Sequence, residues 1–141
     1  TTQVLKAMPW GKCAIFGDPH VISFDRIYGP PVTNTDPGEY YLVKSDSLSI
    51  HGRFGYTARF PTASSTVGIA MGGPALKGHT LVVEYVGPEK GYKGFMVFWD
   101  KKEILAEYPS SFTSDDGILS AYHDAMDPNL FHREGRHTIG G

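Results

Sequence analysis

The sequence has little cysteine and no long hydrophobic run. Cys13 is the single cysteine among 141 residues, so no disulfide forms within the chain and the small cystine-stapled domains are excluded. The densest apolar run, Phe95–Trp99, is far shorter than the roughly 18–20 residues needed to span a bilayer. We therefore expect no transmembrane segment and a domain held together by packing. Cys13 is then either a small buried side chain or half of an intermolecular pair.

The sequence also has no large excess of charge of one sign. Thirteen Lys and Arg stand against fifteen Asp and Glu, a formal net charge of −2. No basic patch or stripe occurs, so nothing in the sequence favours binding to nucleic acid or to an anionic membrane surface. The opening Thr1–Lys12 lacks the basic flank and apolar core of a signal peptide. Because the chain begins on Thr rather than Met, we expect it to be processed or excised from a longer precursor.

The residues that are present indicate a β fold. Hydrophobic residues make up 40% of the chain, and its 17 Gly and 10 Pro are scattered rather than periodic. Short runs of Val, Ile, Tyr and Phe are broken about every eight to twelve residues by Gly/Pro turns, including the segment "YGPPVTNTDPGE". We expect strands near Ala14–Phe16, Val21–Asp25, Tyr40–Lys44, Leu48–Phe54, Thr66–Met71, Thr80–Tyr85, Phe95–Trp99 and Glu103–Leu105. The predicted fold is an antiparallel β-sandwich.

Three parts are expected along the chain: an arm at residues 1–12, a β domain at 13–109 and a polar extension at 110–141. The sequence of the extension predicts a short helix starting at Ser114, followed by an irregular end. The apolar residues with roughly helical spacing are Ile118, Leu119, Tyr122 and Met126, and Pro128 would end the helix. Within the β domain, "WDKKEI" predicts a hairpin that turns at residues 100–102.

Two stretches invite a catalytic or ligand-binding interpretation. "GGPALKGHT", Gly72–Thr80, superficially resembles a phosphate-binding loop, but His79 stands where the loop needs Lys. An ordinary turn between two strands is the better interpretation. The other stretch, "KCAIFGDPHVISFD", gathers Cys13, an Asp-Pro-His tripeptide and a second aspartate. No Gly-x-Ser-x-Gly nucleophile motif occurs, which leaves acyl-transfer hydrolysis without support.

The second stretch carries a family resemblance. "CAIFGDPHVISFD", Cys13–Asp25, resembles the start of a von Willebrand factor type D domain, which has a Cys, three residues, Gly-Asp-Pro-His and then Phe-Asp-Gly. Weaker similarity continues to about Leu105, through "GEYYLVKSD", "LSIHGRF", "STVGIAMGGPALKGHTLVVEY" and "FMVFWDKKEI". The resemblance implies a β domain that serves multimerisation, matrix building or protein binding.

The sequence departs from this family in ways that bear on its chemistry. Gly38 stands where the family has an early cysteine, and the later Cys-Gly-x-Cys-Gly-Asn-Phe-Asp-Gly segment is absent. In the family that segment supplies most ligands of a structural calcium ion, with the aspartate that matches Asp25 completing the shell. Asp25 alone is a weak calcium candidate because Ca²⁺ takes about six to eight oxygen ligands. We therefore expect no cofactor, and no metal site beyond this weak calcium candidate.

The Asp-Pro-His tripeptide leaves two interpretations open. In some family members this peptide breaks by itself at mildly acidic pH, and the same chemistry here would use Asp18, Pro19 and His20. The Asp18 side chain would attack its own carbonyl, and the Pro19 amide would leave with help from His20. The alternative is that Gly17 and Pro19 shape a tight connection while Asp18 and His20 bond neighbouring backbone. We favour the connection.

The expected function is therefore non-catalytic. The sequence predicts a structural and protein-interaction module, a peripheral soluble subunit of a larger extracellular or lumenal assembly that could lie beside a membrane. Its contacts with protein partners must be non-covalent, because the cysteines that link family members are missing. A self-cleaving domain and a calcium-stabilised binding module are the alternatives.

Overall fold

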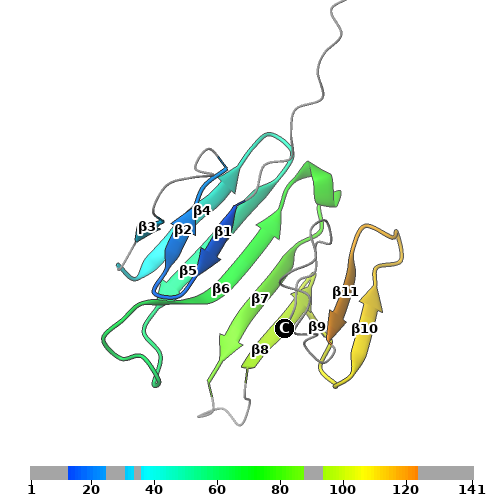
Figure 1. The fold of residues 1–141 in the computed structure, drawn as a ribbon. Helices are drawn as coiled ribbons and strands as arrows, with labels where there is room; N and C mark the ends of the chain where they lie inside the picture. The colour runs from blue at the N-terminus through cyan, green and yellow to red at the C-terminus, as the bar shows by residue number, and fades with distance from the viewer. Residues whose placement is uncertain (1–12, 25–30, 34–35, 88–93, 124–141) are drawn as a thin grey trace, which may run out of the picture.

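The computed structural model describes residues 13–24, 31–33, 36–87 and 94–123, which form eleven strands in three antiparallel sheets (Figure 1). The predicted all-β, antiparallel class is confirmed. The strands are β1 (Ala14–Phe16), β2 (His20–Ile22), β3 (Val32–Thr33), β4 (Gly38–Lys44), β5 (Ser49–Gly55), β6 (Ser65–Gly72), β7 (Leu81–Val86), β8 (Gly94–Trp99), β9 (Lys102–Ile104), β10 (Ser110–Thr113) and β11 (Ser120–His123). All eight expected strands are present, β1 with the expected bounds and the others with shifted ends, and β3 lies in a segment expected to hold only turns.

The largest sheet contains β4 to β9 side by side in sequence order. Such an order needs only hairpin connections, each of which the local sequence provides. Between β8 and β9, Asp100 and Lys101 have φ angles of 48° and 68°, and Trp99 pairs with Lys102. Two positive φ values make a type I′ turn, whose twist matches that of the strands. The predicted hairpin is confirmed, with a turn of two residues rather than three.

The connection between β6 and β7 confirms the predicted turn at Gly72–Thr80. It contains one 3₁₀ turn, Pro74–Leu76, which is the only helical segment among the described residues. Gly73 has φ 124°, and a Cβ there would lie 2.8 Å from the carbonyl oxygen of Ser47. This glycine lets the connection pass close to the turn before β5. No helix in the described ranges has the length and hydrophobicity to cross a membrane.

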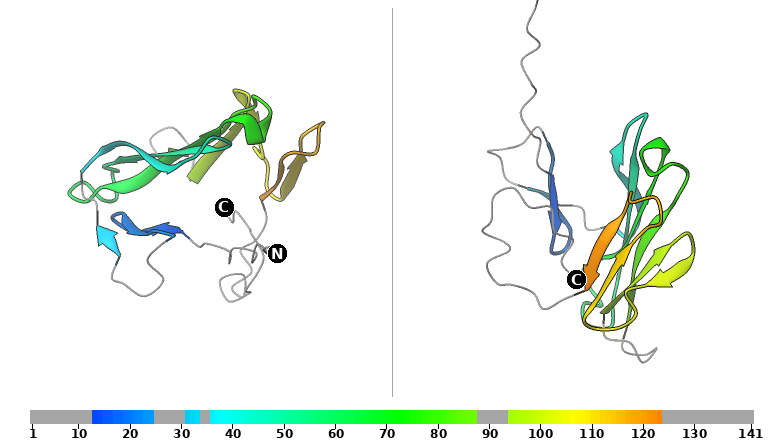
Figure 2. Two further views of the ribbon diagram at one scale, coloured as in Figure 1. Left: turned by 90° about the horizontal axis from the view of Figure 1, so that it is seen from above. Right: turned by 90° about the vertical axis from the view of Figure 1, so that its right-hand side faces the viewer.

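The hydrophobic core lies on one face of the six-stranded sheet. Its centre is Leu81, Trp99 and Ile104, which are adjacent in the sheet and less than one-tenth exposed. Phe54, on the same face by strand alternation, is 3% exposed. Figure 2 shows the three-stranded sheet β1–β3 as a second, smaller layer over this face. The other face of the large sheet, which we call the open face, has no described strand over it.

Polar and apolar side chains share the open face. Arg53 lies at its centre and pairs with Glu39 on β4, at 2.8 Å, and with Glu84 on β7, at 3.4 Å. Beside this row, the Tyr41 ring contacts His51 with centroids 4.1 Å apart. All of these charged groups are about half exposed, which is typical of a solvated sheet face.

The predicted helix after Ser114 is wrong, because this segment is the hairpin β10–β11 (Figure 1). The Ser114 hydroxyl accepts a hydrogen bond from the Leu119 amide at 3.0 Å, and the Asp116 carboxylate accepts one from the Ile118 amide at 3.1 Å. Gly117 between them has φ 71°. Ser and Asp side chains compete for backbone amides in this way, and here they close a turn instead of starting a helix. Met126 and Pro128 lie outside the described residues.

The hairpin shares the core of the large sheet. Phe112, Ile118 and Leu119 pack against the cluster of Leu81, Trp99 and Ile104. Ile118 and Leu119 are therefore apolar because they pack against the edge of the sheet, and not because they lie on one face of a helix. Residues 110–123 and the strands β7–β9 form one packed unit.

Candidate functional site

The structure places the Asp-Pro-His tripeptide in the connection between β1 and β2. Phe16 pairs with His20 across the hairpin, and Gly17 turns the chain with φ 68°. Pro19 is completely buried. The His20 Nδ1 atom lies 3.0 Å from the Asp18 carboxylate. Gly17 and Pro19 thus form a tight connection, and in it the side chains of Asp18 and His20 contact each other.

An aromatic ring also contacts this turn. The His20 ring stacks on Phe16 with centroids 5.5 Å apart and planes at 11°, and about half of Phe16 is exposed. Asp25, the weak calcium candidate, lies outside the described residues. Within the described ranges, no three His, Cys, Asp or Glu side chains gather where they could hold a metal ion. Cys13 is a free, partly buried thiol.

A second Asp–His pair joins the β6–β7 connection to the β8–β9 turn. His79 precedes β7, and its Nδ1 atom donates to the Asp100 carboxylate at 2.5 Å. The other oxygen of Asp100 accepts from the Thr80 amide at 2.9 Å. The amide of Asp100 in turn donates to the Thr80 carbonyl at 2.9 Å. These bonds fix the type I′ turn against the start of β7, and they orient the imidazole.

His79 also faces a carboxylate from a third segment. Its Nε2 atom lies 3.4 Å from Asp116 in the β10–β11 turn. The hydroxyl of Ser114 donates to the other Asp116 oxygen at 2.7 Å. The chain therefore brings together residues 79, 100 and 116, which come from three separate turns. We call Asp100, His79 and Asp116 the His79 cluster.

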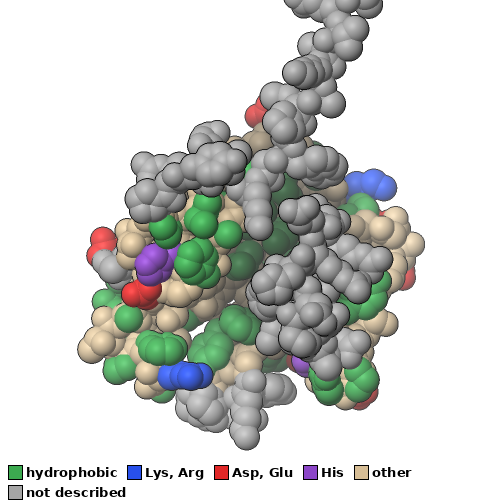
Figure 3. Space-filling model, viewed as in Figure 1, with side chains coloured by type: hydrophobic (Ala, Val, Ile, Leu, Met, Phe, Trp, Pro, Cys, Tyr) green, Lys and Arg blue, Asp and Glu red, His purple; other side chains and the backbone are tan. Residues whose placement is uncertain are grey.

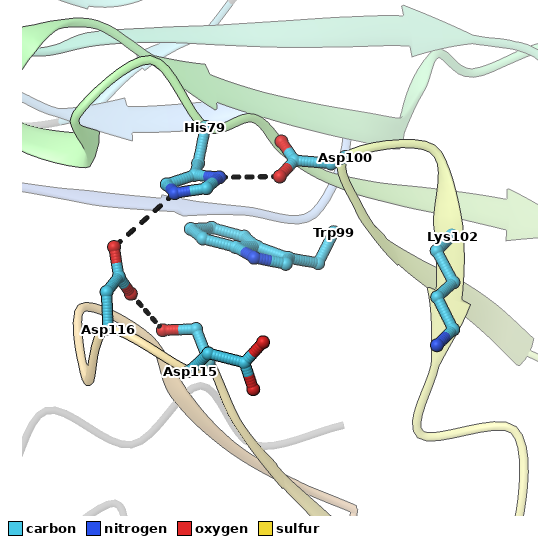
Figure 4. Close-up of a pocket in the computed structure, with 7 residues that line it drawn as sticks. His79, Trp99, Asp100, Lys102, Asp115 and Asp116 are labelled. Carbon is cyan, nitrogen blue, oxygen red and sulfur yellow. Dashed lines mark hydrogen bonds and ion pairs between the residues drawn. The ribbon is translucent and has the colours of Figure 1, made fainter.

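An aromatic ring lies beside the His79 cluster. The indole of Trp99 stacks on the imidazole with centroids 4.9 Å apart and planes at 24°. Figure 4 shows the two rings one above the other, with a carboxylate on each side of His79. These residues border an open cavity of about 370 Å³. Its lining consists of His79, Trp99, Asp100, Lys102, Ser114, Asp115 and Asp116.

The electrostatics of the His79 cluster favour an imidazolium between two carboxylates. The hydrogen bond to Asp100, strengthened by the charges of both carboxylates, raises the pKa of His79 above its ordinary value. The pKa of Asp100 is lowered by the hydrogen bonds from His79 and the Thr80 amide. Hydrogen bonds from Ser114 and the Ile118 amide lower the pKa of Asp116. Each shift stabilises the charged form of its group.

This geometry does not prepare a nucleophile. In a serine-based site the hydroxyl must lie against the imidazole that takes its proton. Here the Ser114 hydroxyl donates to Asp116 and accepts from the Leu119 amide, and the residue is only 6% exposed. Both nitrogens of His79 face carboxylates. The cluster joins three turns, and its polar atoms are engaged in doing so.

Sequence reasoning missed the His79 cluster, because His79 and Asp116 are far apart in the chain and belong to no known motif. One part of the signal was readable. Asp100 stands in the turn of the predicted hairpin, and His79 ends the preceding connection, so pairing of β7 with β8 brings the two close together. The sequence places Asp116 in a predicted helix, and this prediction hides its role.

Comparisons with protein-family models, with curated proteins and with solved structures found no match for this chain. The resemblance of Cys13–Leu105 to von Willebrand factor type D domains therefore stays a prediction made from the sequence.

Proposed function

We propose that this chain is a non-catalytic structural module that binds protein partners within a larger assembly. The observation that carries the proposal is the amount of aromatic surface turned outward. Among the residues that the structure describes, five hydrophobic side chains are buried, whereas nine large ones are about half exposed or more. The exposed residues are Phe16, Phe24, Val32, Tyr41, Tyr56, Phe60, Phe95, Tyr108 and Tyr122.

Such side chains are costly to leave in water and are favoured at interfaces. Scattered apolar residues are normal on a protein surface, but aromatic residues in particular are enriched in protein–protein contacts. On the face drawn in Figure 3, hydrophobic side chains reach the surface in several places. On the open face, Tyr41 is 57% exposed, with Lys44 over its ring at 4.7 Å. Tyrosine combines a large apolar ring with a polar tip, which suits a contact surface that is wet before binding.

The state of the polar clusters supports a module without catalysis. His20 and Asp18 form an ion-pair contact in a hairpin whose proline is buried. In the His79 cluster, the imidazole and both carboxylates bond protein groups. Because a catalytic group must present a free donor or acceptor to its substrate, the engaged atoms of the His79 cluster favour a structural role.

The family resemblance and the single thiol extend the proposal. An extracellular or lumenal assembly, including one beside a membrane, suits a von Willebrand type D-like domain. Because the cysteines that link family members into polymers are missing, its contacts with partners would be mainly non-covalent. Binding would then rest on apolar burial, with polar residues such as Arg53 and its carboxylate partners beside the apolar contacts.

Native mass spectrometry of the tagged chain, purified from its source at pH 7.5 and then held at pH 5.5, tests both parts of the proposal. We expect a complex heavier than the 15.5 kDa chain, and an intact chain at both pH values. Tyr41→Ser should reduce the recovered partner, whereas Asp46→Ser, a matched exposed polar control, should not. A fragment beginning at Pro19 would show self-cleavage, and a lone, stable monomer would contradict the binding role.

A further inference from the structure

We propose that His79 is a proton-controlled latch that fastens the β10–β11 hairpin to the edge of the six-stranded sheet. When His79 is protonated, it bridges Asp100 and Asp116, and when it is neutral, it releases Asp116. This inference goes beyond the proposed function and does not rest on it. It concerns how firmly one part of the fold is held, and which condition loosens it.

The latch follows from the number of protons that an imidazole can donate. A protonated imidazole has an N–H at both ring nitrogens, whereas the neutral ring has one donor and one lone pair. The contact of Nδ1 with Asp100 is 2.5 Å and that of Nε2 with Asp116 is 3.4 Å. On deprotonation, the shorter bond keeps its proton. The Nε2 lone pair then faces an anionic oxygen of Asp116, and an attraction becomes a repulsion.

The two carboxylates lie on different parts of the fold. Asp100 is fixed to the sheet through its bonds with Thr80, whereas Asp116 belongs to the β10–β11 turn. Figure 4 shows His79 between these two turns. The ion pair therefore crosses the boundary between the hairpin and the sheet, and its loss acts on that boundary.

Other contacts decide how far the hairpin is released. Phe112, Ile118 and Leu119 stay packed against the core, and the Nδ1 atom of His123 lies 3.2 Å from the Leu105 carbonyl and 3.1 Å from the Glu107 carbonyl. Deprotonation of His79 should thus increase local opening of the hairpin without detaching it.

The charges near His79 set the pH range. Asp100 and Asp116 face the ring directly, Lys102 and Asp115 border the same cavity, and Lys77 acts on Asp116. Because the folded pKa of His79 is raised, its contribution is complete below the ordinary value of about 6.5 and is lost as pH rises through the folded value. The carboxylates have lowered pKa values, so their contribution is complete above about 3.9 and is lost as pH falls further. The latch is strongest between these limits.

Amide hydrogen exchange of the whole chain tests the latch. Protection factors of the turn amides of Ser114, Gly117 and Leu119, corrected for the intrinsic effect of pH, should fall roughly two- to fivefold between pH 5.5 and 8.5. The fall should follow the titration of His79 measured by NMR on the same sample. Amides that join β5 to β6 serve as the internal control and should keep their protection.

Two variants separate the latch from a general effect of pH. In Asp116→Asn, the amide oxygen can still accept from Ser114 and Ile118, but no anion faces Nε2 of His79, so the fall in hairpin protection with rising pH should disappear. His51→Gln, which removes a histidine from the open face, should keep it. Wild-type hairpin protection that stays constant through the titration of His79 would overturn the proposal. An undiminished pH dependence in folded Asp116→Asn would do the same, and should that variant not fold, the wild-type titration decides.

Discussion

Two regions of this protein combine a histidine, an aspartate and an aromatic ring, and they differ in how the chain builds them. In the β1–β2 turn, Phe16, Asp18 and His20 come from five consecutive residues. In the His79 cluster, the histidine and its first aspartate are 21 residues apart. The first group is a local feature of one hairpin, whereas the second exists only when several strands are paired.

The aromatic rings show what this difference means for stability. Phe16 is 49% exposed, whereas Trp99 is 8% exposed and belongs to the core. The group at the β1–β2 turn therefore lies on the surface, whereas the His79 cluster contacts the packed core of the large sheet through Trp99. The Asp-Pro-His motif makes the first group recognisable in the sequence, although the His79 cluster connects more segments of the fold.

The largest expected effect is on stability, when the aromatic ring of each group is removed in turn. Trp99→Ala should lower the free energy of unfolding by about 3–5 kcal/mol, because it leaves a cavity in the core. Phe16→Ala should cost about 1 kcal/mol or less, since half of this ring is already in water. Urea denaturation followed by circular dichroism measures both. Trp99→Phe offers a milder variant, and equal losses for Phe16→Ala and Trp99→Ala would contradict the contrast.

Glycine substitutions in the two turns should give a smaller effect. Gly17 and Gly117 have similar φ angles, 68° and 71°, so alanine costs about 1–2 kcal/mol of left-handed strain at either site. A Cβ at Gly17 would also lie 3.3 Å from Nδ1 of His20, whereas the space beside Gly117 is open. We therefore expect Gly17→Ala to lower the urea midpoint more than Gly117→Ala does. The reverse order would show that the Asp18–His20 contact is too loose to resist the added methyl group.

The smallest effect should be on titration rather than on global stability. Because Asp100 is the main cause of the raised pKa of His79, Asp100→Asn should move that pKa down toward its ordinary value of about 6.5. Stability contributed by the His79–Asp100 pair would then be lost at a lower pH. NMR of the imidazole carbon-bound protons measures the shift, and Asp18→Asn is the matched control that should leave His79 unchanged. If the pKa of His79 does not change in Asp100→Asn, the raised pKa would be due to Asp116 instead.

Much of the fold could be predicted because its contacts are local in sequence. Apolar runs between Gly/Pro turns located all eight expected strands, and "WDKKEI" indicated the β8–β9 hairpin. The prediction failed at Ile118 and Leu119, whose spacing fits a helix as well as two positions near a buried turn. Ser114 and Asp116 decided between them by bonding the turn amides, and such bonds are as common in turns as at helix starts.

The candidate site was predictable only in part. The sequence pointed to Asp18, Pro19 and His20, and the structure shows a compact turn in which Pro19 is buried. It could not point to Asp116, because that residue meets His79 through the packing of the hairpin on the sheet edge.

By itself, the sequence determined the class of fold and the connections between neighbouring strands, because strand periodicity and turn chemistry act over a few residues. Only the tertiary structure decided which face of the large sheet is buried and where the β10–β11 hairpin packs. It also decided that His79 lies between two carboxylates. Those outcomes depend on the docking of segments distant in the chain, where burial of apolar surface, and not local preference, selects the arrangement.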